Sequence, residues 1–563
     1  MTLSDNAMTE PIRRLPDPIV NADGKLEGKS VLTPQAVKTR GAIAIPSSKV
    51  IPVILVPGIM GSNLRAHAQK DDLQNQTLRR GQSAWRPPNG MRAGLREADI
   101  WEGRGPAVRQ KILDGDTLEV DDTGLIDASD GIEGVDVEQL RKRWWGEVHW
   151  DSYGSLLCEL QIKLNSTFET SLILRRRQLN DHWESIIQYD HEKWDAADMP
   201  ALTVANLEKF AGYQYPVYAC GYNWTQSNEL SGARLKKRVL EIINSWTTRK
   251  FDCKQVILVT HSMGGLVARA CAKQIPDKIA GVLHGVMPAL GAPLAYRRMA
   301  CGTEKSSPSA GWKGEIAMEK FSQIAGNTTE KTTPTMATAC GALELLPNHL
   351  YPTPWLMASV RKTDGTIEDI CPLLYSNVYD LYRDFAAWYR LVDLDLVDPA
   401  RKYKLNTEEM KRAVVQAIGQ AEKFHTKVLA SYYHPNSYAY YGADSEQLSF
   451  GVFRWITNNQ EALKDPIRSL VVVGQGAGTN LNGGKTMTMP KNFAGAGTSY
   501  FFMPSEQDAP GDGTVSHQSG DGPRGKVKRV FRTTGFAHQG SYKDKHMISL
   551  TFHLIARIVQ EAK

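Results

Sequence analysis

Short apolar runs, each closed by turn residues, recur along the chain from Val50 onward. They lie at 50–56, 215–220, 255–260 and 279–287. A run of this length without polar interruption predicts a strand that is buried on both faces, as in a parallel sheet. Residues 229–246 lie between the second and third runs and carry apolar side chains at helical spacing. This order of strand, helix and strand predicts a doubly wound, mostly parallel α/β sheet.

The C-terminal part continues the same pattern. Runs at 469–473 and 527–533 predict two further strands of this sheet, and the spacing within 546–563 predicts a closing amphipathic helix. Two long stretches, at about 62–210 and about 290–465, do not fit the alternation. Structureless loops of that size are improbable in a compact domain, so we interpret both as largely helical insertions that form a cap or lid.

Residues 1–48 are polar, contain proline and lack apolar periodicity. They predict a leader or arm, followed by one α/β domain over 49–563 that the two insertions interrupt. The length of 563 residues would also allow three to four separate domains. The strand pattern favours the single interrupted domain.

The composition of the chain argues against nucleic-acid binding and against a disulfide or zinc framework. The 67 Lys and Arg exceed the 61 Asp and Glu by only 6, too small a surplus for binding a phosphate backbone, so nucleic acid is not an expected partner. The seven cysteines are scattered and indicate neither a disulfide framework nor a zinc site. No run approaches the roughly 18 apolar residues of a spanning helix, and the N-terminus lacks the apolar core of a secretory signal. We therefore expect a soluble protein made in the cytoplasm.

The most informative segment is VTHSMGGLVAR at 259–269. An apolar strand there runs directly into His-Ser-x-Gly-Gly and then into a helix pattern, which is the context that a nucleophile elbow requires. Small residues beside the serine let a sharp turn present its hydroxyl above the sheet. We therefore predict Ser262 as the nucleophile, although Thr260 stands where this motif usually has glycine.

A nucleophilic serine needs a base, and the base needs a carboxylate that orients it. The acid and base that follow an elbow serine come in the order Asp, then His, which favours Asp512 in GDGTV and His538 directly after the last predicted strand. The alternatives are Asp508 and Asp521 for the acid, and for the base a set of three histidines: His517, His546 and His553.

Backbone N–H groups are the expected donors to the oxyanion of the reaction. One belongs to Met263, the residue after the serine, and another to the loop after the first strand, where Ile59 is the first candidate and Met60 the second. The mechanism needs no cofactor. No acidic cluster has the spacing of a calcium loop, so no metal ligands are assigned.

Several motifs together resemble the lecithin:cholesterol acyltransferase and PGAP1-like branch of the α/β-hydrolases. The similarity runs from about residue 50 to the end and rests on these segments: LVPGIMGS, GYNWTQSN, HSMGG, MPALGAP, CGALELLPN, GQGAGT and GDGTVS. The resemblance implies an α/β-hydrolase fold, lipid or ester substrates, a Ser262, Asp512 and His538 triad, and an oxyanion hole at Ile59 and Met263. A second similarity is to bacterial phospholipase effectors of the type VI secretion system (Tle-type).

These patterns predict a serine esterase or lipase, with a phospholipase as the first hypothesis. The alternatives are an intracellular carboxylesterase, a lipid acyltransferase, and a catalytically silent binding protein on a hydrolase scaffold. The expected partners are a lipid or other ester substrate and a transiently contacted membrane surface. If the protein is a secreted antibacterial effector, an immunity protein, a secretion-machinery partner and a type VI-like export route to target-cell membranes are also expected.

Two further features have competing interpretations. The GGKT segment at 483–486 suggests a phosphate-binding loop, but Thr479 stands where that motif needs its first glycine, so a hairpin turn is favoured. Five tryptophans of the first insertion could form either a lipid-facing surface or the aromatic core of a cap. They are Trp85, Trp101, Trp144, Trp145 and Trp150.

Overall fold

The computed structural model describes eight main ranges of the chain. They are 47–67, 77–127, 136–171, 176–306, 312–404, 406–475, 483–490 and 497–563. Within the predicted arm, only residues 47–48 and four short strands are described, namely β1 (Ile12–Arg14), β2 (Ile19–Val20), β3 (Leu26–Glu27) and β4 (Arg40–Ala42). The rest of the predicted arm lies outside the described residues.

A six-stranded parallel sheet forms the centre of the molecule. Its order is β11-β5-β12-β13-β16-β23, and every neighbouring pair is parallel. The strands are β5 (Val53–Val56), β11 (Val217–Ala219), β12 (Val256–His261), β13 (Ile279–Gly285), β16 (Ser437–Gly442) and β23 (Arg529–Thr533). The chain therefore has the doubly wound, parallel central sheet that the alternation of strands and helices predicts, and this sheet agrees with the α/β-hydrolase-like fold that the resemblance implies.

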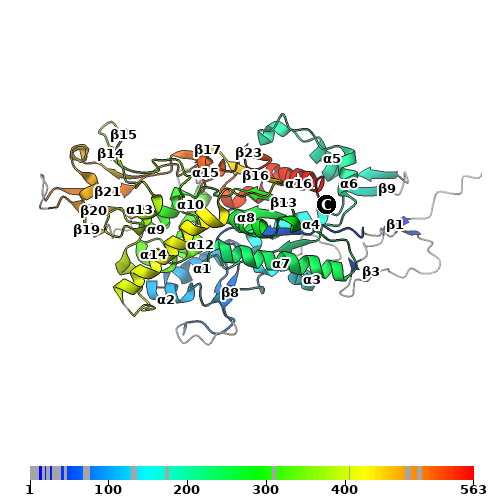
Figure 1. The fold of residues 1–563 in the computed structure, drawn as a ribbon, viewed down its shortest axis with the longest axis horizontal. Coiled ribbons are helices and arrows are strands. Elements are labelled where there is room, and N and C mark those ends of the chain that lie inside the picture. Colours follow the sequence, from blue (N-terminus) through cyan, green and yellow to red (C-terminus); the bar gives the residue numbers. More distant parts are fainter. Residues whose placement is uncertain are drawn as a thin grey trace, which may run out of the picture.

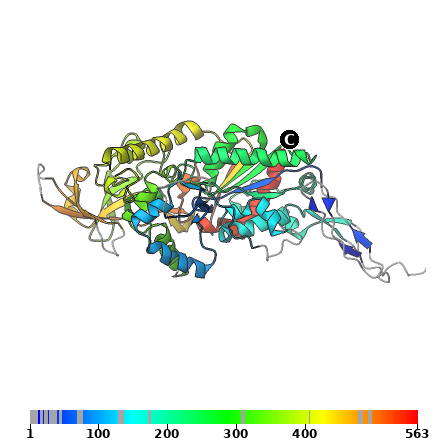
Figure 2. The ribbon, with the colours of Figure 1, turned by 90° about the horizontal axis from the view of Figure 1, so that it is seen from below.

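Helices cover both faces of this sheet (Figure 2). One face packs against α7 (Asn228–Thr248) and α8 (Gly264–Gln274), and the other against α4 (Trp150–Lys163) and α16 (Lys545–Val559). Alternate residues of β5 face the two layers, Ile54 toward the layer of α7 and α8 and Leu55 toward the layer of α4 and α16. Burial on both faces explains why the strand reads as an unbroken apolar run. The predicted helices at 229–246 and 546–563 are thereby confirmed.

A second six-stranded sheet lies at one end of the elongated molecule (Figure 1). Its order is β15-β14-β18-β21-β20-β19, and only β14 and β18 run parallel. The strands are β14 (Leu356–Arg361), β15 (Ile367–Pro372), β18 (Phe453–Thr457), β19 (Val471–Gln475), β20 (Lys485–Thr488) and β21 (Ser499–Pro504). The run at 469–473 is thus a strand, but its expected place in the central sheet is wrong.

The strand that takes this place is β16, which lies inside the second predicted insertion. Its sequence, SYAYYG, is rich in tyrosine, and all six residues are buried. Tyrosine carries an apolar ring and a polar hydroxyl, so its runs give a weaker strand signal than aliphatic runs. The remaining elements between 290 and 465 are α9 (Pro293–Cys301), α10 (Trp312–Ala325), α11 (Thr329–Met336), α12 (Cys340–Leu343), α13 (Val378–Arg383), η4 (Leu394–Leu396), α14 (Thr407–Lys423), η5 (Phe424–Leu429), β17 (Asp444–Ser449) and η6 (Gln460–Leu463).

The first predicted insertion combines small sheets with short helices. Its elements are β6 (Leu64–Ala66), β7 (Ser83–Trp85), α1 (Met91–Glu102), α2 (Pro106–Ile112), β8 (Leu118–Val120), α3 (Val137–Lys142), η1 (Trp145–Glu147), α4, β9 (Phe168–Ser171), β10 (Arg176–Leu179), α5 (Asp181–Ile187), η2 (His191–Trp194) and α6 (Val204–Phe210). Trp85, Trp101 and Trp145 are buried, while Trp144 and Trp150 are half-buried. The structure therefore supports the aromatic core over the lipid-facing surface.

Five short elements complete the chain. They are η3 (Pro276–Lys278), η7 (Ile467–Ser469), β22 (Ala509–Gly511), α15 (His517–Gly520) and η8 (His538–Lys543). None of the described helices is both long and apolar enough to cross a membrane.

Candidate functional site

The turn between β12 and α8 has the geometry of a nucleophile elbow. Strand β12 ends at His261, Ser262 follows with a φ of 52°, and α8 begins at Gly264. A residue with a side chain is strained at this positive φ, and such strain is typical of functional positions. The N–H of Ser262 donates to the carbonyl of Gly285, 2.9 Å away, which anchors the turn to β13.

The glycines after the serine are required by close packing. A Cβ at Gly264 would lie 2.4 Å from the carbonyl oxygen of Val56, and a Cβ at Gly265 would lie 2.6 Å from the sulfur of Met287. Thr260 replaces the usual first glycine without leaving its hydroxyl unpaired, because Oγ1 donates to the carbonyl of Leu283 at 3.1 Å. The departure from the motif is therefore compatible with the elbow.

Asp512 and His538 form a buried pair at the same edge of the sheet. Nδ1–H of His538 donates to Oδ2 of Asp512 at 2.8 Å, and the N–H of His538 donates to the carbonyl of Asp512 at 2.7 Å. The other carboxylate oxygen accepts the N–H groups of Thr514 and Val515 at 3.0 and 2.8 Å. These bonds leave Nε2 of His538 as the nitrogen that can take up a proton.

His261 brings this pair beside the elbow. Its Nε2–H donates to the carbonyl of His538 at 3.0 Å, and the two imidazole centroids lie 5.1 Å apart. Because His261 directly precedes Ser262, the bond ties the loop of His538 to the serine turn. Within the described part of the chain, no hydrogen bond joins Ser262 Oγ to His538. Such bonds are often long in a free enzyme and tighten when substrate binds.

A buried tyrosine extends this network to the loop after β5. The hydroxyl of Tyr153, on α4, donates to Nδ1 of His261 at 3.0 Å and accepts the N–H of Gly58 at 3.0 Å. Burial, together with the nearby His538, lowers the pKa of His261 to about 3. His261 is therefore neutral at physiological pH, with its proton on Nε2.

The loop after β5 closes in a tight turn at the elbow. The N–H of Gly61 donates to the carbonyl of Gly58 at 3.1 Å, and Met60 has a φ of 62°. A Cβ at Gly58 would lie 3.1 Å from that of Ser262, so the loop and the serine are in direct contact. The carbonyl of Met60 accepts the indole N–H of Trp85 at 2.9 Å.

Three N–H groups near the serine remain available. Among the described residues, the backbone N–H groups of Ile59, Met60 and Met263 have no hydrogen-bond acceptor. These are the three residues that the sequence predicts as oxyanion donors. An unpaired N–H beside a nucleophile can stabilise the negative charge that develops on a carbonyl oxygen during acyl transfer.

The alternative acids and bases have other partners. Asp508 pairs with Arg454 at 2.7 Å, and Asp521 pairs with Arg524 at 2.7 Å. His517 contacts the carbonyl of Pro510 through Nδ1, His546 contacts Tyr189, and His553 accepts from Arg557. Of the predicted candidates, only Asp512 and His538 lie together at the elbow.

The sequence does not predict the hydrogen bond between Tyr153 and His261 at the site. They are 108 positions apart, and no motif links them. His261 was visible as the residue before the serine, but its contacts depend on α4, whose place could not be read from the sequence. No cluster of three or more potential metal ligands occurs in the described ranges.

The chain is similar to one known protein family and to one solved structure. The PGAP1-like alpha/beta domain family matches residues 230–305, which include most of α7, β12, the elbow and β13. The solved structure of the Tle4–Tli4 complex contains a chain with 27% sequence identity and a TM-score of 0.71, and the match covers 91% of this chain and 99% of that one. No curated protein matches the chain. The protein thus has an α/β-hydrolase-like fold with a PGAP1-like alpha/beta segment, and these likenesses support its resemblance to the Tle-type hydrolases.

Proposed function

We propose that the protein is a serine hydrolase of the lipase or phospholipase type, in which Ser262, His538 and Asp512 form the catalytic triad. The observation that carries the proposal is the buried Asp512–His538 pair, tied through His261 to a serine at positive φ. The likenesses to the PGAP1-like domain and to Tle4 support a hydrolase that acts on lipid esters.

In the proposed reaction, Nε2 of His538 accepts the proton of Ser262 Oγ as the oxygen attacks the ester carbonyl. Asp512 accepts Nδ1–H, fixes the tautomer and stabilises the imidazolium that forms. The tetrahedral intermediate then expels the alcohol, which takes the proton from His538 and leaves an acyl-serine. Water repeats the two steps, giving the carboxylic acid and the free enzyme.

The N–H groups of Ile59 or Met60 and of Met263 hold the oxyanion in this proposal. The network of Gly58, Tyr153 and His261 fixes the donor loop relative to the elbow. The donors are therefore already oriented before the charge develops, which is the condition under which electrostatic stabilisation is most effective.

Helix α1 is the proposed membrane contact. Met91 is 77% and Leu95 41% exposed, on adjacent turns of one face, and the neighbouring Arg92 and Arg96 are also exposed. Apolar side chains beside cations suit the headgroup region of an anionic bilayer. The helix is coupled to the site because its Trp101 packs against Trp85, with ring centroids 5.7 Å apart.

The proposed biological setting is a secreted effector with a cognate partner. Tle4 is found in complex with Tli4. We infer that this chain, likewise, binds an immunity protein in the cell that makes it and is exported by a type VI route.

The primary test compares wild type, Ser262→Ala and the control Ser359→Ala on a panel of phospholipid, triglyceride and short esters. Ser359 is another buried serine, on β14 of the second sheet. We expect an alkyl fluorophosphonate to label wild type and Ser359→Ala but not Ser262→Ala, with released fatty acid following the same pattern. A folded wild type that is neither labelled nor active would overturn the proposal.

The membrane contact is tested with the double variant Met91→Ser/Leu95→Ser. We expect weaker binding to anionic vesicles and slower hydrolysis of vesicle lipid, while hydrolysis of a short soluble ester stays unchanged. Unchanged vesicle binding would contradict the role of α1.

A further inference from the structure

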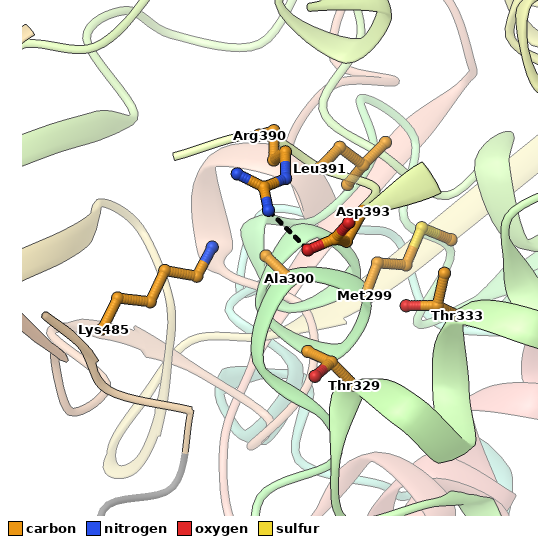
Figure 3. A pocket seen from close by; sticks show the side chains of 8 residues that line it. All are labelled: Met299, Ala300, Thr329, Thr333, Arg390, Leu391, Asp393 and Lys485. Atoms are coloured by element: carbon orange, nitrogen blue, oxygen red, sulfur yellow. Dashed lines mark hydrogen bonds and ion pairs between the residues drawn. The ribbon is translucent and has the colours of Figure 1, made fainter. Parts of the chain in front are cut away.

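A small cavity beside the second sheet is lined by charged groups that already have partners (Figure 3). Arg390 pairs with Asp393. Nζ of Lys485, in the GGKT segment, donates to the carbonyl of Trp388 at 3.1 Å and lies 4.9 Å from the centroid of the Trp455 ring. The carboxylate of Asp393 also attracts this ammonium. The polar contacts that reach the catalytic groups lie elsewhere, at the start of α4.

His149, the residue before α4, contacts three segments of the chain. Its backbone N–H donates to the carbonyl of Gly61 at 2.9 Å, in the donor loop (57–62). Nε2 of its ring lies 2.9 Å from the carbonyl oxygen of Pro88, in the segment before α1. Nδ1 lies 2.6 Å from Oγ of Ser152, which is buried in the first turn of α4. One residue therefore links the donor loop, the entry of α1 and the start of α4.

The protonation state of this ring gives its hydrogen bonds a direction. A carbonyl oxygen only accepts, so Nε2 of His149 carries the proton that bonds Pro88. Burial lowers the pKa of His149, although the carbonyl of Pro88 and the carboxylate of Asp151 act in the opposite direction. The ring is therefore neutral at pH 7. Nδ1 is then an acceptor, and the hydroxyl of Ser152 donates to it.

The hydroxyl of Ser152 continues this chain to the loop of the proposed base. Its oxygen accepts Nε2–H of Gln539 at 2.7 Å, and Gln539 directly follows His538. The amide of Gln539 also interacts with the hydroxyl of Tyr153. The hydrogen bonds run in one direction, from Gln539 through Ser152 to His149. Bonds in such a chain polarise and strengthen one another.

We propose that His149 is a positioning residue of the active site, which sets the loop of His538 relative to the donor loop. Its ring acts on the base loop through Ser152 and Gln539, and its backbone is bound to the donor loop at Gly61. The base and the oxyanion donors must act on the same tetrahedral intermediate, so a small displacement between the two loops lowers the rate. The inference rests on the proposed function, in which His538 is the base.

Steady-state kinetics on a short soluble ester test this role with variants that keep or remove the acceptor at Nδ1. The side-chain oxygen of asparagine takes the place of Nδ1, and the side-chain nitrogen of glutamine takes the place of Nε2. His149→Asn therefore keeps an acceptor for Ser152, whereas His149→Gln keeps only the donor to Pro88. We expect kcat to fall about 10-fold in His149→Gln and in Ser152→Ala, with KM within about twofold of wild type. In His149→Asn, kcat should stay within about threefold of wild type.

Ser322→Ala is the matched control for the serine variant. Ser322 is a buried serine on α10, and its Oγ donates to the carbonyl of Glu319 in the same helix at 2.7 Å. Its kcat should equal that of wild type. An unchanged kcat in Ser152→Ala, or equal losses in His149→Asn and His149→Gln, overturns the proposal, because the acceptor at Nδ1 would then have no effect of its own on catalysis.

Hydrogen exchange followed by mass spectrometry tests the position of the base loop without using catalysis. The N–H of His538 donates to the carbonyl of Asp512, and the N–H of Gly540 donates to that of Ala537. We expect the peptide that contains 538–540 to exchange about 10-fold faster in Ser152→Ala than in wild type, while peptides of α16 exchange at the wild-type rate.

The two measurements separate this inference from the proposed function. Unchanged exchange of the 538–540 peptide in Ser152→Ala overturns the inference, even if the wild type hydrolyses esters. A wild type that is no more active than Ser262→Ala refutes the proposed function. Faster exchange in Ser152→Ala would in that case still support the link from His149 to the loop of His538.

Discussion

Each of the two six-stranded sheets has beside it a buried tyrosine that hydrogen-bonds to a buried histidine. At the central sheet the pair is Tyr153 and His261, with a distance of 3.0 Å between the oxygen and Nδ1. At the second sheet it is Tyr379 and His425, with a distance of 2.9 Å. Burial lowers the pKa of both imidazoles, to about 3 and about 4. A buried, neutral histidine that is hydrogen-bonded to a tyrosine therefore occurs twice in the molecule.

What differs is the position of the pair relative to the strand ends. His261 is the last residue of a parallel strand, with Ser262 next to it, and its Nε2–H reaches the loop of His538. His425 lies on η5, and its Nε2–H donates to the carbonyl of Glu344. In an all-parallel sheet the carboxyl ends of all strands meet at one edge, so loops distant in sequence converge there. The mixed second sheet sends its strand ends in both directions.

The largest expected difference between the two regions concerns two aspartates that are four positions apart. Asp512→Asn should lower kcat by about 10⁴-fold, because the amide no longer fixes the tautomer of His538. Asp508→Asn, which removes one of the two carboxylate partners of Arg454 on the second sheet, should leave kcat within about twofold. Steady-state kinetics on one ester substrate measure both, and comparable losses in the two variants would refute the assignment of the acid.

A smaller difference appears in the pH dependence of stability. Folded His261 stays neutral down to a pKa of about 3, whereas the unfolded chain binds a proton near pH 6.5. Between these values the unfolded state holds more protons, so His261 makes stability fall as the pH falls. Between pH 7 and pH 5, the free energy of unfolding of His261→Gln should therefore fall by roughly 2 kcal/mol less than that of wild type.

Urea unfolding at the two pH values measures this difference, with His425→Gln as the matched variant. Both substitutions should flatten the pH dependence, but only His261→Gln should also reduce activity at pH 7. If the wild type and His261→Gln lose equal stability on acidification, the imidazole is not buried and neutral as described.

The smallest effect is expected from the tyrosine hydroxyls. Tyr153→Phe leaves Gly58 N–H without its acceptor and frees Nδ1 of His261, so we expect kcat to fall by about 10-fold, equivalent to about 1.4 kcal/mol. Tyr379→Phe should lower the free energy of unfolding by a similar amount, about 1.4 kcal/mol, and leave kcat unchanged. A fall in kcat of the same size in both variants would show that the loss is general destabilisation rather than displacement of the donor loop.

The sequence predicts the parts of this molecule that local pattern determines. Aliphatic runs buried on both faces reveal β5, β12 and β13, and the turn chemistry around Ser262 reveals the elbow. The run of valines at 471–473 misleads, because Val471 and Val473 are 54% and 63% exposed on an edge strand of the second sheet. Hydrophobicity alone does not say which sheet a strand joins.

The site is only partly predictable for the same reason. Motif order predicts Asp512 and His538 over their neighbours as the acid and base, and in the structure these two residues lie together beside the elbow. The contacts of Tyr153 depend on how α4 packs against the sheet, which is set by tertiary contacts far apart in sequence. Long-range partners of this kind leave no local signature.

The bond from Trp85 to the carbonyl of Met60 has a consequence for protein engineering. Trp85 belongs to the first insertion, and it packs against Trp101 and Trp224 while it holds the loop after β5. The insertion is therefore not an exchangeable module that can be grafted between hydrolase cores to change substrate range. A chimera that replaces it must supply another donor at this carbonyl, or the transplanted cap and the recipient core will be mismatched at the site of chemistry.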